Sequence, residues 1–174
     1  MSDVAYQEDL MDEPAEASPP FMRTTNAANC LGFVCDRIRG RREAERLCLI
    51  GHSWGTAITA LYTSEHNDHI ERLVLYAPIW LRTDGEQSPV RVDGKVGAYR
   101  TVTREATLTR RQEGLNEEQK LTVMPREWFE QWWDAVTKAQ PEGGGETIRA
   151  PNGVVQDGQE CWQAGKPVYD PAQI

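Results

Sequence analysis

The residues of this sequence that could carry out a reaction lie in one pentapeptide, Gly51-His52-Ser53-Trp54-Gly55. A serine hydroxyl becomes an effective nucleophile when a tight backbone turn exposes it and a base accepts its proton. The glycines at Gly51 and Gly55 remove side chains that would collide where a strand turns tightly into a helix. We therefore expect Ser53 to be a nucleophile. The backbone N–H of Trp54 would then donate to the oxyanion that forms on the substrate.

The same pentapeptide also allows a purely structural interpretation. Gly51 and Gly55 could close a strand-to-helix turn with Ser53 as the helix cap, and Ser53 would then be unreactive. Trp54 could be a pocket wall or a core aromatic, since both are common for tryptophan. The residues that we expect to contact a substrate are His52, Trp54, Trp132 and Trp133.

A base for Ser53 is harder to find, because the chain has only three histidines. His52 adjoins Ser53 and would project away from its hydroxyl. His66 and His69 follow the last turn of the helix that begins at the serine, which places them roughly 20 Å away at 1.5 Å per residue. Their positions suit the C-terminal end of a helix. None of the three is expected to act as the base.

Two short apolar runs flank the pentapeptide and are expected to position it. Leu47 to Ile50 is too short for a helix and is typical of a strand that is covered on both faces. Leu73 to Ala77 is a second such run, and the small residues between the runs recur at helical spacing. Strand, helix and strand within about 30 residues predict a parallel βαβ unit with a right-handed crossover. Ser53 would lie at the carboxyl edge of its sheet.

A further helix is predicted before the first strand. It would begin near Thr24 or Thr25, either of which could supply a capping hydroxyl. The expected apolar stripe consists of Ala27, Leu31, Val34, Cys35 and Ile38. Residues 1–22 are acidic and proline-rich and predict a loop.

After residue 83 the pattern changes from buried strands to shorter elements. Residues 90–102 resemble a hairpin around Asp93-Gly94, which favours a tight turn. Asn116 predicts a capped helix, and Pro125 opens a second helix with an apolar face. The last thirty residues show no sustained period and are expected to run extended over a surface.

Composition limits the class of protein. The net charge is −8, which argues against binding the phosphates of nucleic acids or an anionic membrane. No stretch is apolar enough to span a bilayer, and the first twenty residues hold no lysine or arginine, so we expect a cytoplasmic protein without a secretory signal. Cys30, Cys35, Cys48 and Cys161 lack a metal-binding spacing and are expected to be small buried thiols, so no metal or cofactor is expected.

The stretch from Asn26 to Pro78, with LCLIGHSWGTAITALY at its centre and ERLVLYAP after it, resembles the central part of α/β-hydrolases related to proline iminopeptidase. The resemblance implies an α/β fold consisting of a partial α/β-hydrolase core at residues 24–82, preceded by an acidic loop at residues 1–23. Residues 83–174 would be part of a mainly helical cap, which would include Trp128, Trp132 and Trp133.

Members of that family also have residues with no counterpart here. Before this region they have a loop that supplies a second oxyanion donor, and after the cap they have an acid and a histidine, in the order Ser, acid, His. Some members place the acid near the position of Asp84, which we interpret as a loop residue because no histidine is expected beside it. The chain is therefore interpreted as an incomplete member of the family.

The expected function is that of a serine hydrolase that cleaves an ester or a small peptide amide through an acyl-enzyme on Ser53. Activity is not expected from this chain alone, because the acid and the histidine are missing. The alternatives are a binding module without chemistry, or a truncated gene product. For a peptide substrate, the side chains that could offset the charge of an N-terminal amine are Glu127, Glu130 and Asp134.

Overall fold

The computed structural model describes residues 14–79, 96–139, 145–162 and 165–174. The chain divides into two compact units. The first consists of Met1–Ala98 with Pro151–Ile174 and contains the Ser53 turn, so we call it the elbow unit. The second, Tyr99–Ala150, contains the tryptophan-rich helix, and we call it the aromatic unit. Among the described residues, no helix is long and apolar enough to cross a bilayer.

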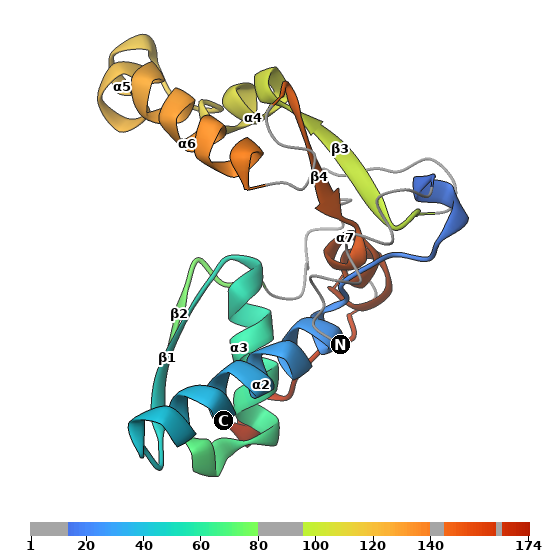
Figure 1. Cartoon of the computed structure of the whole chain (residues 1–174), viewed down its shortest axis with the longest axis vertical. Helices are drawn as coiled ribbons and strands as arrows, with labels where there is room; N and C mark the ends of the chain where they lie inside the picture. The colour runs from blue at the N-terminus through green and yellow to red at the C-terminus, as the bar shows by residue number, and fades with distance from the viewer. Residues whose placement is uncertain (1–13, 80–95, 140–144, 163–164) are drawn as a thin grey trace. The chain divides into compact units, whose positions relative to one another are not determined.

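The elbow unit is built on the βαβ arrangement that the sequence predicts. Strands β1 (Leu47–His52) and β2 (Ile70–Tyr76) are parallel and hydrogen-bonded, and helix α3 (Trp54–Glu65) connects them with the short helix η2 (Asn67–His69). Helix α2 (Thr24–Arg42) precedes β1 and packs against α3 (Figure 1). The α/β class and the parallel pairing of the strands are therefore confirmed.

The core of the elbow unit lies on one face of this sheet. Residues from α2, α3 and β2 form a buried cluster, against which Leu47, Leu49, Leu73 and Leu75 pack. The opposite face of the sheet is exposed: the exposed fraction is 75% for Ile50, 52% for Val74 and 67% for Tyr76. The expectation of strands covered on both faces is wrong for the described residues, because both helices pack on the same side. Cys48 is exposed for the same reason, which corrects its assignment as a buried thiol.

Helix α2 uses a narrower apolar face than its sequence suggests. Ala28 and Cys35 are buried and Leu31 packs against the core, whereas Val34 and Ile38 are 53% and 43% exposed. The predicted stripe is therefore wrong at Val34 and Ile38. One helical neighbour covers only one side of a helix, and α3 is the element against which α2 packs most extensively.

The end of the chain folds into the elbow unit, which corrects the expectation of an extended surface segment. Its elements are α7 (Gly153–Asp157), a π-helical turn η3 (Gly158–Trp162) and η4 (Pro171–Gln173). Tyr169 belongs to the buried cluster beside α2 and α3. The Gly153 N–H donates to the Phe21 carbonyl, which ties the start of α7 to the segment before α2. In the same unit, the Ala98 N–H donates to the carbonyl of Ala15, the first residue of η1 (Ala15–Ala17). Elements this short leave too few turns for a periodic pattern to emerge.

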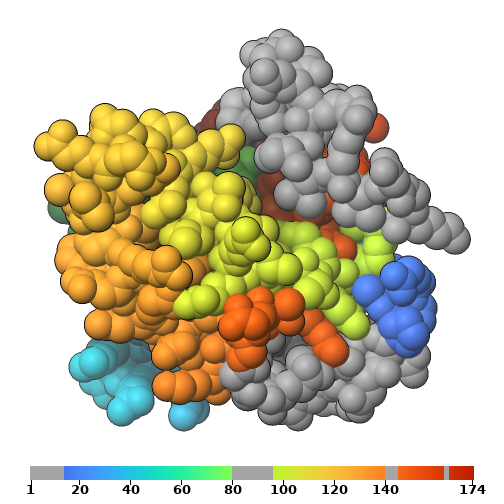
Figure 2. All heavy atoms as spheres, turned by 90° about the horizontal axis from the view of Figure 1, so that it is seen from above, coloured from blue at the N-terminus to red at the C-terminus, as the bar shows by residue number. Residues whose placement is uncertain are grey.

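The aromatic unit contains a two-stranded sheet of β3 (Tyr99–Thr103) and β4 (Thr147–Pro151), together with α4 (Arg104–Arg111), α5 (Glu117–Val123) and α6 (Arg126–Lys138). The helices predicted at Asn116 and Pro125 are confirmed, the first with a complete capping box between Asn116 and Gln119. Phe129 and Trp133 are buried. Atoms of α4 to α6, yellow to orange, lie at the surface in Figure 2. The predicted hairpin turn at residues 90–95 and Asp84 lie outside the described residues.

Candidate active site

Ser53 occupies a sharp, strained turn at the carboxyl end of β1. Its backbone angles are φ 53° and ψ −123°, a conformation that residues other than glycine rarely adopt. Such strain costs on the order of 1–3 kcal/mol and persists only where the surrounding structure enforces it. Ser53 is exposed and stands at the N-cap position of α3, yet its side chain makes no capping hydrogen bond. The structural interpretation, in which the hydroxyl caps the helix, is therefore not supported.

Gly51 lets β1 approach the start of α3. A Cβ atom at Gly51 would lie 2.6 Å from the Gly55 carbonyl oxygen and 2.8 Å from the Thr56 Cα, and it would also meet the Thr59 hydroxyl. A Cβ atom at Gly55 would meet no described atom within 4 Å. The predicted steric need for glycine is thus confirmed at Gly51 and is not found at Gly55.

Hydrogen bonds join the turn to the end of β2. The Ser53 N–H donates to the Tyr76 carbonyl at 3.1 Å, so the hydrogen bonding between the two strands continues as far as the turn. The buried Thr56 hydroxyl donates to the Ser53 carbonyl at 2.5 Å and accepts from the Ile79 N–H at 3.1 Å. Ala77, between these contacts, also has a positive φ of 49°. The strained conformation of Ser53 is therefore held from both strands and from α3.

Trp54 is anchored to the start of α2. Its ring is half-buried, and the indole N–H donates to the Thr24 hydroxyl oxygen at 2.9 Å. Trp54 is therefore not a fully buried core residue, and its role as a pocket wall stays a prediction. The sequence pattern offered no sign that Thr24 would be its partner.

Thr24 is itself held by a carboxylate from the end of the chain. The Thr24 N–H donates to Asp157 Oδ2 at 2.6 Å, and the Arg23 guanidinium donates to the other oxygen of Asp157. A second arm of Arg23 contacts Glu160 at 2.7 Å. Burial by itself lowers the pKa of Arg23, but the hydrogen bonds to Glu160 and Asp157 raise it above its ordinary value. Arg23, and not Thr24 or Thr25, is the N-cap residue, which corrects the predicted cap.

The histidines do not converge on Ser53. The His52 ring stacks on Tyr76 with the ring centroids 5.3 Å apart, on the exposed face of the sheet. His66 ends α3 and lies 4.7 Å from the Tyr62 ring and 5.6 Å from the His69 ring. The length of α3, about 18 Å for twelve residues at 1.5 Å each, separates His66 from Ser53.

The tryptophans proposed for substrate contact belong to the aromatic unit. Trp133 is 2% exposed and its indole donates to the Gly145 carbonyl at 2.9 Å, whereas Trp132 is half-buried beneath the Arg111 guanidinium, 4.1 Å from its ring centroid. Of the three acidic residues suggested for an amine, Glu130 is paired with Arg104 and Arg126, and the other two, Glu127 and Asp134, are exposed.

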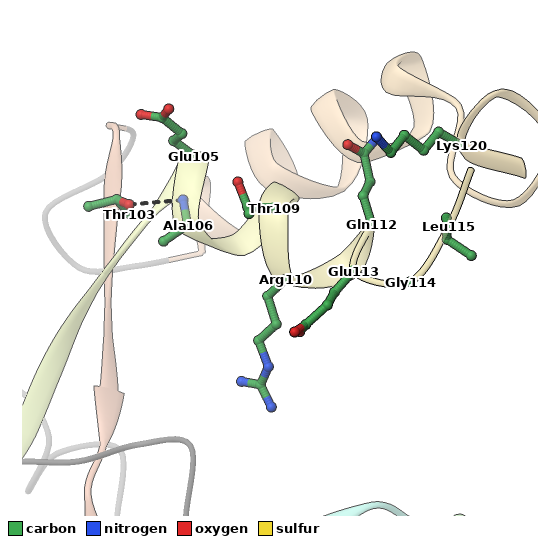
Figure 3. Close-up of a pocket in the computed structure, with 10 residues that line it drawn as sticks. All are labelled: Thr103, Glu105, Ala106, Thr109, Arg110, Gln112, Glu113, Gly114, Leu115 and Lys120. Carbon is green, nitrogen blue, oxygen red and sulfur yellow. Dashed lines mark hydrogen bonds between the residues drawn. The ribbon is translucent and has the colours of Figure 1, made fainter. Parts of the chain in front are cut away.

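Each unit also has a surface cavity that does not include Ser53. One, of about 900 Å³, lies along α4 and the start of α5, where Arg110 and Glu113 point to the same side (Figure 3). The other, of about 570 Å³, is lined by residues of the elbow unit that include Pro19, Arg23 and Glu160. Ser53 lines neither of them.

Comparison with protein families gives a match over residues 25–113, about half of the chain. The matching family is described as Serine aminopeptidase, S33. The match includes α2, the Ser53 turn, both strands of the elbow unit and α4. Searches of curated proteins and of solved structures found no match.

Proposed function

Because the chain belongs to the S33 serine aminopeptidase family, a family of α/β-hydrolases, we propose that Ser53 is the nucleophile of a serine hydrolase. The observation that carries the proposal is the backbone of Ser53, with φ 53° and ψ −123° at an exposed turn between β1 and α3. A strained serine whose hydroxyl serves no capping role is suited to attack a carbonyl carbon.

In the proposed reaction, the Ser53 oxygen attacks the carbonyl of an ester or a small peptide amide. A base takes the serine proton as the new C–O bond forms and returns it to the alcohol or amine that leaves as its bond to the carbonyl carbon breaks. Water then attacks the acyl group in the same way, which releases the acid and restores the serine hydroxyl. The Trp54 N–H belongs to the first turn of α3, where backbone amides lack partners within the helix and the helix dipole favours negative charge. It is the proposed donor to the oxyanion.

We further propose that this chain does not activate Ser53 by itself. His66 and His69 lie at the other end of α3, and the His52 ring is stacked on Tyr76. Without a base, a serine hydroxyl is a poor nucleophile. This arrangement favours a second candidate function, a binding module that keeps the turn without chemistry.

The proposed substrate class is a small ester or a peptide with a free N-terminal amine, acted on in the cytoplasm and without a cofactor. The name of the matching family favours the peptide. Glu127 and Asp134 remain available to a cation, since both are exposed, whereas Glu130 is already paired with arginines. The roles of His52, Trp54, Trp132 and Trp133 in binding a substrate stay predictions.

A fluorophosphonate probe, read by mass spectrometry of the labelled peptide, tests the proposal with and without added imidazole. We expect negligible labelling of the chain alone and labelling of Ser53 when imidazole supplies the missing base. Ser53→Ala should abolish the adduct. Ser64→Ala, which removes another serine of α3 whose hydroxyl bonds to Leu61, should not. Prompt labelling without imidazole would contradict the missing base, and no labelling of Ser53 with imidazole would contradict its role as nucleophile.

A further inference from the structure

A buried carboxylate at the far end of the chain is connected to the Ser53 turn. Asp157, the last residue of α7, is 3% exposed. A buried carboxylate is costly unless it is hydrogen-bonded and paired with a cation. Both needs are met at the start of α2, by the Thr24 N–H at 2.6 Å and by the Arg23 guanidinium. The two residues that meet here, Thr24 and Asp157, are 133 positions apart in the sequence.

The next contact runs from Thr24 to the turn. Thr24 is 1% exposed, and its hydroxyl accepts the indole N–H of Trp54 at 2.9 Å. Thr24 thus donates through its backbone to Asp157 and accepts through its side chain from Trp54. Asp157, Thr24 and Trp54 form a continuous chain of contacts, which we call the Asp157 relay, and it ends beside Ser53.

We propose that Asp157 and Thr24 are positioning residues for the Ser53 turn. By holding the indole of Trp54, the Asp157 relay fixes the position of the Trp54 backbone N–H relative to the Ser53 hydroxyl. The proposal rests on the roles proposed above for Ser53 and Trp54. An oxyanion donor works only when its position is set within about 0.5 Å by groups that are themselves held in place. The indole anchors the first residue of α3, and the carboxylate anchors the residue that receives the indole.

A purely structural role would end at the cap of α2. In that case Asp157 would stabilise the first turn of α2 through the Thr24 N–H and the helix dipole, and the Thr24 hydroxyl would be unimportant for Ser53. Thr24→Val separates the two roles, because it retains the backbone N–H and the shape of the side chain but removes the acceptor for Trp54. Thr24→Ser retains the hydroxyl and is the matched rescue.

The first measurement is the indole N–H resonance of Trp54 in the ¹⁵N-labelled full chain, assigned by its loss in Trp54→Phe. We expect Thr24→Val and Asp157→Asn to move this resonance and to speed its exchange with solvent by about tenfold or more, the ratio for one lost hydrogen bond. Thr24→Ser should preserve both properties. Glu160→Gln, which alters only the exposed partner of Arg23, is the control and should also preserve them. An unchanged Trp54 resonance in Thr24→Val would overturn the relay.

The second measurement is the rate at which the fluorophosphonate probe acylates Ser53 in the presence of imidazole. We expect Thr24→Val and Asp157→Asn to be slower by about tenfold or more, as for a misplaced oxyanion donor, and Thr24→Ser to match the wild type. Equal rates in the wild type and in Thr24→Val would overturn the positioning role. If no variant, wild type included, is acylated, the proposed function fails, and the indole measurement alone decides whether the relay exists.

Discussion

The indole N–H of Trp54 donates to the hydroxyl oxygen of Thr24 at 2.9 Å, across 30 positions of sequence. This bond joins the first residue of α3 to the first turn of α2, beside the strained Ser53. Helix α2 precedes β1 and helix α3 follows it, and the bond holds the two helices together at the end that carries Ser53. The turn depends on tertiary contacts that the pentapeptide alone does not contain.

The close approach at Gly51 predicts different effects for the two glycines of the pentapeptide. Gly51→Ala should destabilise the chain by about 1–3 kcal/mol, because the new methyl group meets backbone atoms of α3 that cannot move freely. Gly55→Ala has open space and lies in a helix, so it should be neutral or stabilising by up to about 1 kcal/mol. Urea denaturation followed by circular dichroism measures both. Equal losses from the two substitutions would show that the approach at Gly51 is not tight.

Removing the buried carboxylate should destabilise the elbow unit. Asp157→Ala leaves the Thr24 N–H without its acceptor and Arg23 without its inner partner, a loss of about 1–3 kcal/mol. Glu160→Ala is the matched control: its side chain is 51% exposed and its ion pair with Arg23 is screened by water, so the expected loss is smaller than that of Asp157→Ala. Denaturant midpoints of the two variants make the comparison, and a larger loss in Glu160→Ala would contradict it.

The stability of the elbow unit should fall in alkali. Burial raises the pKa of Tyr62 from 10.0 to about 12, with a contribution from Cys35, and burial also raises the pKa of Cys35. Both groups ionise more easily in the unfolded chain than in the folded one. Their contribution to the free energy of unfolding is therefore complete below about pH 8, begins to fall as Cys35 and then Tyr62 ionise in the unfolded chain, and is lost as the pH rises toward 12. For Tyr62 the loss is about 2 kcal/mol at pH 12, from 1.36 kcal/mol per pKa unit.

Denaturation midpoints measured between pH 8 and pH 12 test this dependence. Tyr62→Phe removes the phenol and should flatten the decline above about pH 10. The Tyr76→Phe control removes an exposed phenol and should leave the decline as in the wild type. The same slope in Tyr62→Phe and in the wild type would contradict a buried, protonated Tyr62.

Within the aromatic unit, two tryptophans of α6 should differ sharply. Trp133 is 2% exposed and bonded to the Gly145 carbonyl, so Trp133→Ala should cost about 3–5 kcal/mol. Trp128 is 59% exposed, and Trp128→Ala should change stability by about 0.5 kcal/mol or less. Thermal unfolding followed by circular dichroism compares them. Similar losses would show that Trp133 does not fill the interior of this unit.

The structure could be predicted from the sequence where the contacts that determine it are local. The turn at Ser53 and the capping box at Asn116 follow from residues a few positions apart, and the parallel strands follow from a strand–helix–strand pattern within about 30 residues; the structure contains all three. The cap of α2 could not be predicted, because Asp157 reaches Thr24 from 133 positions away. A single aspartate in a short helix carries no periodic signal.

Burial of the strands was harder to predict for a different reason. A continuous apolar run is typical of a strand covered on both faces, and Ile50 and Val74 belong to such runs. Their side chains are nonetheless exposed, because the helices of the described chain pack on the opposite face. The composition of a strand indicates whether its side chains are suited to burial. Whether they are buried depends on the elements that pack against the strand.

The central claim that we propose is that the Ser53 turn has the backbone geometry of a nucleophile turn, while none of the three histidines, all of them described, is placed to act as its base. Hydrolysis of p-nitrophenyl acetate by the wild type and by Ser53→Ala tests it most directly, because a working triad loses several orders of magnitude in rate when its serine is removed. We predict rates that agree within about twofold, since an unactivated serine contributes little beyond solvent. A wild-type rate at least about a hundredfold above that of Ser53→Ala would contradict the claim and would mean that this chain supplies its own base.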